Sequence, residues 1–374
     1  QLRTTMYRRQ QPYVAMMWQR ILAIAFIKSN YVLGYKMTNQ AVSLIQSDRA
    51  ESWQEILSDL VTDPQELLRI LELDADTSPY SLEALHQFPL KAPRPFVERI
   101  ERGNWHDPLL RQIWPSAAEE TQTEGFVADP LDEEKFNPLP GLLHKYEGRV
   151  LLTAAPHCAI HCRYCFRRHF DYQANSPSRA QWKEAFAYIA ADNSIEEVIL
   201  SGGDPLAISD KQFNWLLQQL ADIEQLTTVR IHTRLPIVIP QRITKELVGC
   251  LNETRLCVVM VVHCNHRQEL DSEVTSGFHA LGEAGVTLLN QAVVLKDVND
   301  NASTLADLNK ALFQHNVLPY YLHMPDQVAG TEHFYVTDQH ATELIKTLHA
   351  SLPGYLVPRL VRENPGQQGK TRIA

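Results

Sequence analysis

The sequence predicts an α/β protein in which a partial (β/α)6 barrel of parallel strands follows a small helical domain. After Arg149, short β-branched runs alternate with amphipathic stretches, as in parallel sheets with crossover helices. The expected strands are Val150–Ala154, Glu197–Ser201, Thr228–Thr233, Leu256–His263, Val286–Val294 and Leu318–His323. The expected helices are 178–191, 210–221, 242–250, 267–284, 302–315 and 337–349. About 220 residues suit a curved, partly open barrel, so functional residues are expected at the carboxyl ends of its strands.

The chain divides by composition into four predicted segments. Apolar residues recur at helical spacing from Trp53 onward, and Asp63-Pro64 has the pattern of a helix start. The next segment is acidic and contains several prolines, which predicts an irregular connector before the barrel. The segments are 1–36, a basic and apolar extension; 37–110, the helical domain; 111–148, the connector; and 149–374, the barrel.

The first 36 residues are interpreted as lying outside the folded domain. Arg8 and Arg9 precede an apolar stretch and Ala23-Ile24-Ala25, so a secretory signal peptide is the alternative. The longest apolar run there, Ile21 to Ile27, is far shorter than the about 20 residues that span a bilayer. No membrane-spanning segment is therefore expected.

Charge and cysteine content restrict the class of partner. The chain has 35 Lys and Arg against 44 Asp and Glu, a formal net charge of −9, which argues against nucleic acid or an anionic membrane as the main partner. Six cysteines in 374 residues are too few for a disulfide scaffold. The sequence therefore favours a reducing, cytoplasmic location.

Three of the cysteines form a metal-binding motif directly after the first strand of the barrel. Cys158, Cys162 and Cys165 follow the pattern C-x3-C-x2-C. Three thiolates on a four-iron cluster leave one iron open for a small molecule, whereas a closed structural site normally uses four protein ligands. The alternative is a structural zinc ion with His157 or His161 as the fourth ligand.

This motif, with Tyr164 before its last cysteine, resembles the signature of radical S-adenosylmethionine enzymes. The resemblance implies a [4Fe-4S] cluster whose open iron binds S-adenosylmethionine, and a deoxyadenosyl radical that takes hydrogen from a C–H bond. After the second strand comes SGGDPL, whose glycines allow close backbone approach to a ligand. The resemblance implies that Gly202, Gly203 and Asp204 bind the methionine amino group of S-adenosylmethionine.

The segment RENPGQQGKTRIA at residues 362–374 resembles the pyridoxal phosphate loop of the lysine 2,3-aminomutase family. The resemblance implies that Lys370 bonds to pyridoxal 5'-phosphate and that Glu363 matches a substrate-binding aspartate. The loop departs from the pure glycine run of the family. The run LHKYEGRVLL resembles HRYPDRVLL, which implies that Lys145 and Arg149 hold the phosphate of pyridoxal phosphate and that Tyr146 packs nearby.

Further matches to the same family concern the substrate. Arg167, in CFRRHF, matches an arginine that binds the substrate carboxylate. The planar guanidinium group suits this task because it can form two parallel hydrogen bonds to a carboxylate. Asp326 matches an aspartate that pairs with the distal ammonium of lysine. The segments VVHCNH and NQAVVLKDVND resemble parts of the S-adenosylmethionine pocket, which implicates His263 and Gln291.

The resemblance as a whole implies an L-lysine 2,3-aminomutase that makes (R)-β-lysine. The sequence ends four residues after Lys370, without the extension of the long catabolic enzymes. It resembles the short branch of the family, whose product a lysyl-tRNA-synthetase-like ligase attaches to elongation factor P. The alternatives are an aminomutase for glutamate or another amino acid, and a non-catalytic iron–sulfur carrier or zinc-stabilised binding module.

Overall fold

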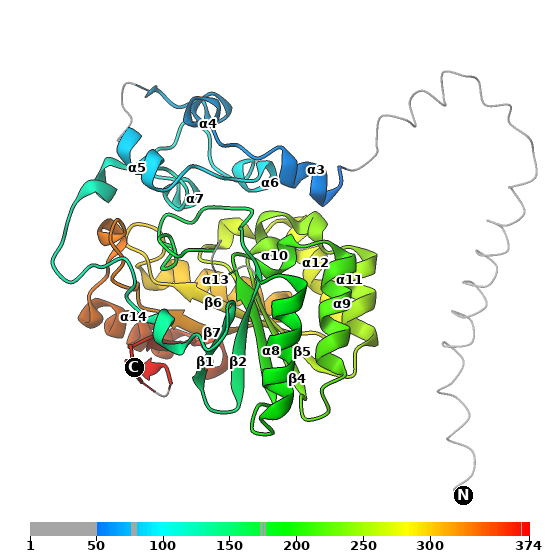
Figure 1. The fold of residues 1–374 in the computed structure, drawn as a ribbon. Coiled ribbons are helices and arrows are strands. Elements are labelled where there is room, and N and C mark those ends of the chain that lie inside the picture. The colour runs from blue at the N-terminus through cyan, green and yellow to red at the C-terminus, as the bar shows by residue number, and fades with distance from the viewer. Residues whose placement is uncertain (1–50, 76–80, 173–174, 176, 368) are drawn as a thin grey trace, which may run out of the picture. The chain divides into compact units, whose positions relative to one another are not determined.

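The computed structural model of the protein describes residues 51–75, 81–172, 175, 177–367 and 369–374 (Figure 1). Residues 52–374 form one compact unit. The extension or signal peptide predicted for residues 1–36, and the start of the predicted helical domain at 37–50, lie outside the described residues. Within the described part of the chain, no helix has the length and apolar character needed to cross a membrane.

One sheet of nine strands runs through the barrel, and its strand order follows the sequence from β1 to β9. Strands β2 to β8 are parallel to their neighbours, while β1 and β9 add antiparallel edges. The strands are β1 Leu142–Tyr146, β2 Arg149–Ala155, β3 Glu197–Gly202, β4 Thr228–Thr233, β5 Cys257–His263, β6 Thr287–Val293, β7 Val317–His323, β8 Arg359–Arg362 and β9 Thr371–Arg372. The predicted α/β class with parallel strands is confirmed, and the six predicted strands are β2 to β7. Strand β8 was not predicted, because four residues with a charged residue at each end carry too little pattern.

Helices cross over between the parallel strands, and in Figure 1 α8, α9, α11 and α12 lie outside the sheet. All of them except α10 begin where a Ser, Thr, Asp or Asn side chain accepts a hydrogen bond from a backbone N–H of the first turn, a cap worth about 1 kcal/mol each. The helices are α8 Arg179–Ala191, α9 Asp210–Ala221, α10 Leu235–Val238, α11 Lys245–Glu253, α12 Ser272–Glu283, α13 Ala302–Gln314 and α14 Asp338–Ser351. Short 3-10 helices are η2 Ala117–Glu120, η3 Glu133–Phe136, η4 Pro205–Ala207, η5 Pro240–Arg242, η6 Arg267–Glu269, η7 Glu332–Phe334 and η8 Gly354–Leu356.

Two predicted helices differ by more than two residues from their bounds in the structure. The helix expected at 242–250 begins at Lys245 because Thr244 is its cap. The helix expected at 267–284 is split into η6 and α12, because the Asp271 side chain accepts from the backbone N–H groups of Glu273 and Val274 and starts a new helix there. In both cases a local cap, rather than apolar spacing, sets the boundary.

The helices before the barrel share its hydrophobic core. They are α3 Trp53–Ser58, α4 Pro64–Leu71, α5 Leu82–Gln87, α6 Arg94–Val97 and α7 Pro108–Arg111, and Asp63 caps α4 as its sequence indicated. A continuous cluster of buried apolar side chains runs from Trp53 to Val317. Residues 111–148 contain η2, η3 and β1. The predicted domain boundaries at residues 110 and 148 stay predictions.

Alternation along β4 separates an apolar face from a polar one. Val229 and Ile231 are buried, while the intervening Arg230 and His232 line a cavity. Successive side chains of a strand point to opposite faces, so the two sets of side chains in β4 have different surroundings. The cavity wall combines such polar side chains with apolar ones, among them Ile199 and Val293.

Two loops at those ends touch through their backbones. The Gly203 N–H donates to the Ala155 carbonyl at 2.9 Å, and the Asp204 N–H donates to the His157 carbonyl at 2.9 Å. A Cβ atom on Gly203 would lie 2.3 Å from the His157 carbonyl oxygen. Gly203 thus lets the segment after β3 lie against the start of the cysteine segment.

We predict that Gly203→Ala lowers the free energy of unfolding by about 2–3 kcal/mol, because the added methyl group overlaps a backbone carbonyl that cannot rotate away. Gly249→Ala is the matched control. Gly249 lies inside α11 with no atom within 4 Å of an added Cβ, so this change should stabilise the protein by about 1 kcal/mol. Urea unfolding followed by circular dichroism measures both, and equal stability of the two variants would contradict the prediction.

Candidate active site

All fifteen site residues predicted from the sequence line one cavity of about 480 Å³ at the carboxyl ends of the parallel strands. Loops and strand ends that lie far apart in the sequence supply them, as expected for a barrel of this class. They are Lys145, Tyr146, Arg149, Cys158, Cys162, Cys165, Arg167, Gly202, Gly203, Asp204, His263, Gln291, Asp326, Glu363 and Lys370. The structure therefore brings the predicted cluster ligands, cofactor contacts and substrate contacts together.

The three cysteines lie on the loop after β2 as free thiols. Burial raises the pKa of Cys158 well above its usual value and that of Cys165 to about 12, so metal binding to these two thiols would release their protons. Arg234 donates from Nη1 to Cys162 Sγ at 2.7 Å, which places a positive charge beside one prospective thiolate.

The geometry of these thiols bears on the choice between cluster and zinc. Within the described residues, no group of three or more His, Cys, Asp or Glu side chains is arranged to hold a single metal ion. His161, a candidate fourth ligand, places Nδ1 2.8 Å from the Pro89 carbonyl and stacks on Phe88. Ligands of one zinc ion converge on one point, whereas thiolates of a cluster bind different irons. The described residues therefore form no single-ion site that includes these thiols and His161.

A buried carboxylate supports the cysteine loop. Glu119, from η2, accepts from Arg163 Nε at 2.8 Å and from Arg168 Nη2 at 2.7 Å, and all three side chains are almost fully buried. Arg163 follows Cys162 in the chain and Arg168 lies three residues after Cys165. The sequence analysis missed Glu119, although a glutamate three residues after Ser116 is a recognisable capping box.

On the opposite wall, His263 at the end of β5 contacts the ring of Tyr164. Its Nε2 lies 3.1 Å from the Tyr164 hydroxyl, and the two rings stack with centroids 5.7 Å apart. Burial lowers the pKa of His263 to about 3, so its imidazole is neutral. Gln291 on β6 is the partner of His263 in the parallel register. Both residues therefore occupy neighbouring positions on the cavity wall.

The glycine segment at the end of β3 has a structural role. The Asp204 carboxylate accepts from the Thr233 hydroxyl at 2.6 Å and from the Arg234 N–H at 2.7 Å, so it ties the ends of β3 and β4 together. The Gly202 carbonyl accepts from the Tyr172 hydroxyl at 3.0 Å. The predicted contact of this segment with S-adenosylmethionine stays a prediction.

Lys370 lies beside a carboxylate that it shares with a second lysine. Glu363 accepts from Lys370 Nζ at 2.6 Å and from Lys145 Nζ at 2.7 Å, and the Tyr146 hydroxyl also donates to it. Burial alone would raise the pKa of Glu363, but the two ammonium groups outweigh this effect and hold it at about 2. Lys145 is thus engaged by Glu363. Arg149 packs its guanidinium over the Tyr146 ring at 4.5 Å and makes no ion pair with another described residue.

The two remaining predicted substrate residues differ in their partners. Asp326 forms no hydrogen bond or ion pair through its carboxylate within the described residues, and burial raises its pKa to about 7. Arg167 instead forms a two-bond ion pair with Glu133, from Nε at 2.9 Å and from Nη2 at 2.7 Å. The sequence analysis missed Glu133, because nothing in its local pattern links it to a residue 34 positions away.

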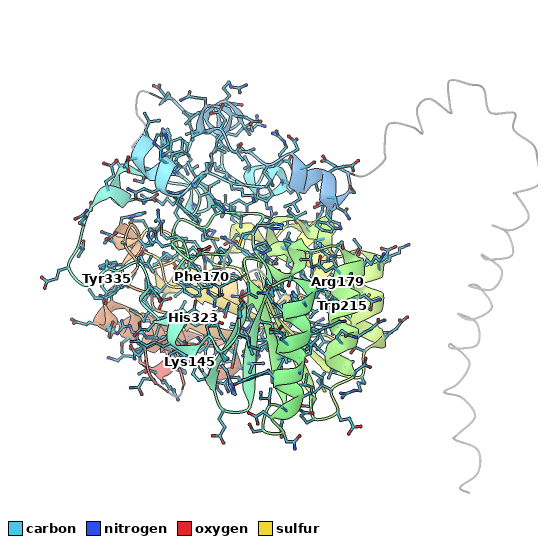
Figure 2. The ribbon with its side chains drawn as sticks, viewed as in Figure 1. Lys145, Phe170, Arg179, Trp215, His323 and Tyr335 are labelled. Carbon is cyan, nitrogen blue, oxygen red and sulfur yellow. The ribbon has the colours of Figure 1, made fainter. Side chains whose placement is uncertain are left out.

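Two cavity histidines were also missed. His232 on β4 and His323 on β7 have buried Nε2 atoms without a partner in the described part of the chain. Burial lowers the pKa of both rings well below its usual value, so they are neutral. Figure 2 labels His323 and Lys145, two residues of this cavity from different elements. Their place at strand ends was the signal that could have identified both histidines.

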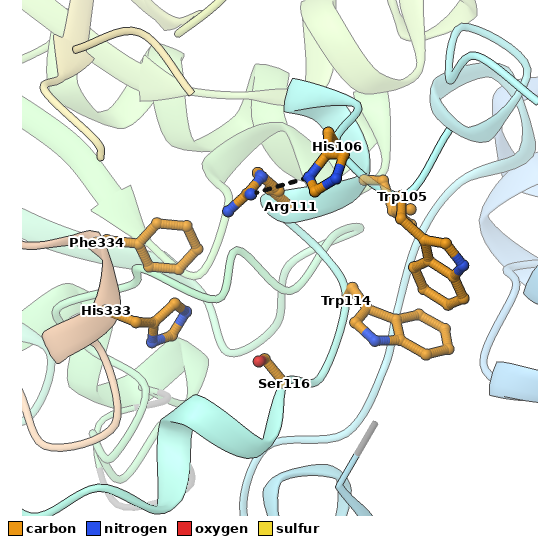
Figure 3. Close-up of a pocket in the computed structure, with 8 residues that line it drawn as sticks. Trp105, His106, Arg111, Trp114, Ser116, His333 and Phe334 are labelled. Carbon is orange, nitrogen blue, oxygen red and sulfur yellow. Dashed lines mark hydrogen bonds between the residues drawn. The ribbon is translucent and has the colours of Figure 1, made fainter. Parts of the chain in front are cut away.

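A second cavity of about 380 Å³ contains none of the predicted residues (Figure 3). Its lining residues are Trp105, His106, Leu110, Arg111, Trp114, Ser116, His333 and Phe334. The Phe334 ring also meets Tyr164 edge-on, with centroids 6.0 Å apart. This contact links the wall of the second cavity to the aromatic residue between Cys162 and Cys165.

Comparisons with known proteins find relatives of this chain over most of its length. Residues 152–248 match the Radical SAM superfamily. The L-lysine 2,3-aminomutase of Haemophilus influenzae is 48% identical over 324 residues, which cover 87% of this chain and 96% of that protein. The L-lysine 2,3-aminomutase of Escherichia coli is 48% identical over 324 residues, 86% of this chain and 94% of that protein. Among solved structures, coproporphyrinogen III oxidase from E. coli, a radical SAM enzyme, has a TM-score of 0.36 at 13% identity over 56% of this chain and 54% of that one.

We predict that Glu119→Gln lowers the free energy of unfolding by about 3 kcal/mol, because two buried guanidinium groups lose their counter-charge. The displaced cysteine loop should also bind less iron after anaerobic reconstitution. Glu98→Gln, at an exposed glutamate, is the control and should change neither quantity. Iron content and urea unfolding of both variants measure the effect. A Glu119→Gln protein with normal iron content and stability would contradict this role.

Proposed function

This chain belongs to the lysine 2,3-aminomutase family of radical S-adenosylmethionine enzymes, which are isomerases, and from that premise we propose that its cavity converts L-lysine to (R)-β-lysine. One observation supports this proposal above all. A single cavity contains a three-cysteine loop, a lysine suited to a coenzyme aldehyde, and an arginine and an aspartate for the two ends of the substrate. An iron–sulfur carrier has no need of Lys370.

The family implies a [4Fe-4S] cluster and S-adenosylmethionine, and the aminomutase branch implies pyridoxal phosphate. We assign the cluster to Cys158, Cys162 and Cys165, and pyridoxal phosphate to Lys370. When bound, the cluster and S-adenosylmethionine supply a carbon radical that takes hydrogen from the substrate, and pyridoxal phosphate supplies a ring that stabilises the unpaired electron. The three thiols that line the cavity and the Nε2 atoms of His232 and His323, which have no partner among the described residues, fit a cavity built for polar ligands.

The cations near Lys370 differ in what they can bind. Arg149 has no carboxylate partner among the described residues, so its guanidinium is available to a phosphate group. Lys145 already neutralises Glu363. We therefore assign the phosphate mainly to Arg149, with Lys145 and Tyr146 holding Glu363 in place beside it. The assignment of His263, Gln291 and the Gly202–Asp204 segment to the S-adenosylmethionine pocket is retained as part of the proposal.

Charge at the two ends of the site favours lysine over glutamate. Arg167 presents a planar fork to an α-carboxylate. We assign Asp326 and Glu363, two acidic groups of the same cavity, to the other end of the substrate, where an ammonium would be attracted and a second carboxylate repelled. L-lysine carries the required pair of groups, and L-glutamate carries the wrong charge at its far end.

The use of the product is a further part of the proposal. We propose that (R)-β-lysine passes to a lysyl-tRNA-synthetase-like ligase for modification of elongation factor P, as the short-branch motifs imply. The six free cysteines support a reducing, cytoplasmic setting for this reaction.

Anaerobic reconstitution with iron, sulfide and pyridoxal phosphate tests the proposed function. S-adenosylmethionine, a one-electron reductant and one amino acid at a time are then added, and the products are separated on a chiral column. (R)-β-lysine from L-lysine is the expected result. Turnover of L-glutamate with none of L-lysine would overturn the assignment of Asp326 and Glu363.

The raised pKa of Asp326 predicts a pH dependence of lysine binding. Below about pH 7 this carboxyl is protonated and loses its attraction for the distal ammonium, so lysine affinity should rise as pH increases through 7. We expect about a tenfold rise between pH 6 and pH 8. In Asp326→Asn the affinity should be lower and lose this dependence. Calorimetric titrations at several pH values measure both proteins, and an equal pH dependence in the two would exclude Asp326 from the ammonium site.

We predict that Lys370→Ala abolishes formation of β-lysine while leaving iron content unchanged, because the cysteine loop does not depend on this side chain. Borohydride reduction should fix pyridoxal phosphate covalently to the wild-type protein and not to the variant. Lys346→Ala, at an exposed lysine of α14, is the control and should retain labelling and activity. Mass spectrometry of the reduced peptides locates the label, and a label elsewhere than Lys370 would refute the assignment.

A further inference from the structure

The ion pair between Arg167 and Glu133 uses only part of the arginine. A guanidinium has two flat edges, and each can hold a carboxylate through two parallel bonds. Glu133 occupies the edge formed by Nε and Nη2, at 2.9 Å and 2.7 Å. The other edge is formed by Nη1 and Nη2, and its Nη1 atom makes only long hydrogen bonds.

That second edge is available to a ligand. Nη1 lies 3.4 Å from the Ser201 hydroxyl and 3.5 Å from the Gly202 carbonyl, both at the long limit for a hydrogen bond. Arg167, Ser201 and Gly202 all line the main cavity. A carboxylate that enters the cavity can therefore bind Nη1 and Nη2 while Glu133 stays in place.

Burial favours retention of the ion pair between Glu133 and Arg167 when a ligand binds. The Arg167 and Glu133 side chains are only 7% and 17% exposed, so separating them would leave a poorly hydrated carboxylate without its counter-charge. The Phe166 and Phe170 rings lie 4.9 Å and 5.6 Å from the guanidinium carbon and further limit its movement. The guanidinium plane is thus held by one carboxylate and two aromatic rings.

We propose that Glu133 is a positioning residue, which orients Arg167 so that its second edge receives the α-carboxylate of the substrate. This inference rests on the proposed function, which supplies that substrate. Hydrogen removal and amine migration both require the carbons next to the carboxylate to be held in one position, and small displacements lower such rates strongly. Glu133 acts through Arg167 and does not itself contact the substrate carboxylate.

The test compares how two ligands bind to the wild-type protein and to variants of Glu133. L-lysine carries the α-carboxylate, whereas L-lysinamide keeps both amines and lacks the carboxylate. Binding is measured by anaerobic calorimetry on the reconstituted holoenzyme with S-adenosylmethionine and without reductant, so that no turnover occurs. Rates of β-lysine formation are measured separately with reductant present.

Three variants separate positioning from a general structural effect. Glu133→Gln keeps the shape of the side chain but removes its charge and one acceptor oxygen. Glu133→Asp keeps both acceptor oxygens on a shorter stem. Glu124→Gln, at an exposed glutamate of the same 111–148 segment, is the matched control.

In Glu133→Gln, L-lysine should bind about 10- to 100-fold more weakly and turn over more slowly, while L-lysinamide affinity changes less than about twofold. Glu133→Asp should recover part of the loss, and Glu124→Gln should match the wild type. An equal loss for both ligands, an unchanged lysine affinity and rate, or tighter lysine binding would each overturn the inference. These outcomes are distinct from failure of the proposed function, which would appear as a wild-type holoenzyme that does not isomerise L-lysine.

Discussion

The cost of burying charge is the constraint on which the interior of this barrel depends. An ionised side chain removed from water must find a partner or shift its pKa. Most buried charges here are paired: Glu119 with Arg163 and Arg168, Glu269 with Arg234, and Glu363 with Lys145 and Lys370. These pairs hold the loops at the carboxyl ends of the strands, so the same interactions that satisfy buried charge also shape the cavity.

Some polar groups of the cavity have no partner among the described residues. Asp326 responds to burial by a pKa raised to about 7, and His232 and His323 respond by staying neutral. Glu363 lies in the same cavity with a pKa of about 2, because two lysines surround it. Two carboxylates of one cavity thus differ in ionisation, because lysines keep Glu363 charged whereas burial raises the pKa of Asp326.

Backbone packing adds a second level of organisation. The segment after β3 lies against the cysteine segment through two backbone hydrogen bonds, and only glycine fits at position 203. Asp204 then ties the end of β3 to the end of β4, next to Arg234, whose guanidinium reaches Cys162. The prospective cluster loop is therefore held by Glu119 through Arg163 and Arg168, by the backbone at Gly203, and by Arg234. Such support positions ligands more accurately than a free loop could.

The sequence by itself determined the parallel α/β class, the six strands β2 to β7 and the order of the chemical motifs, because strand periodicity and motif spacing are local properties of the chain. It also indicated that the predicted residues would meet at strand ends, and all of them line one cavity. Only the tertiary structure decided which charges pair. Lys145 meets Glu363 across 218 residues, and Arg167 meets Glu133 across 34, and no local pattern encodes such distances. Only the tertiary structure also identified the polar neighbours of the site, which are Glu119, Glu133, His232 and His323. A side chain acquires its partner and its ionisation state only when the fold places it beside other residues.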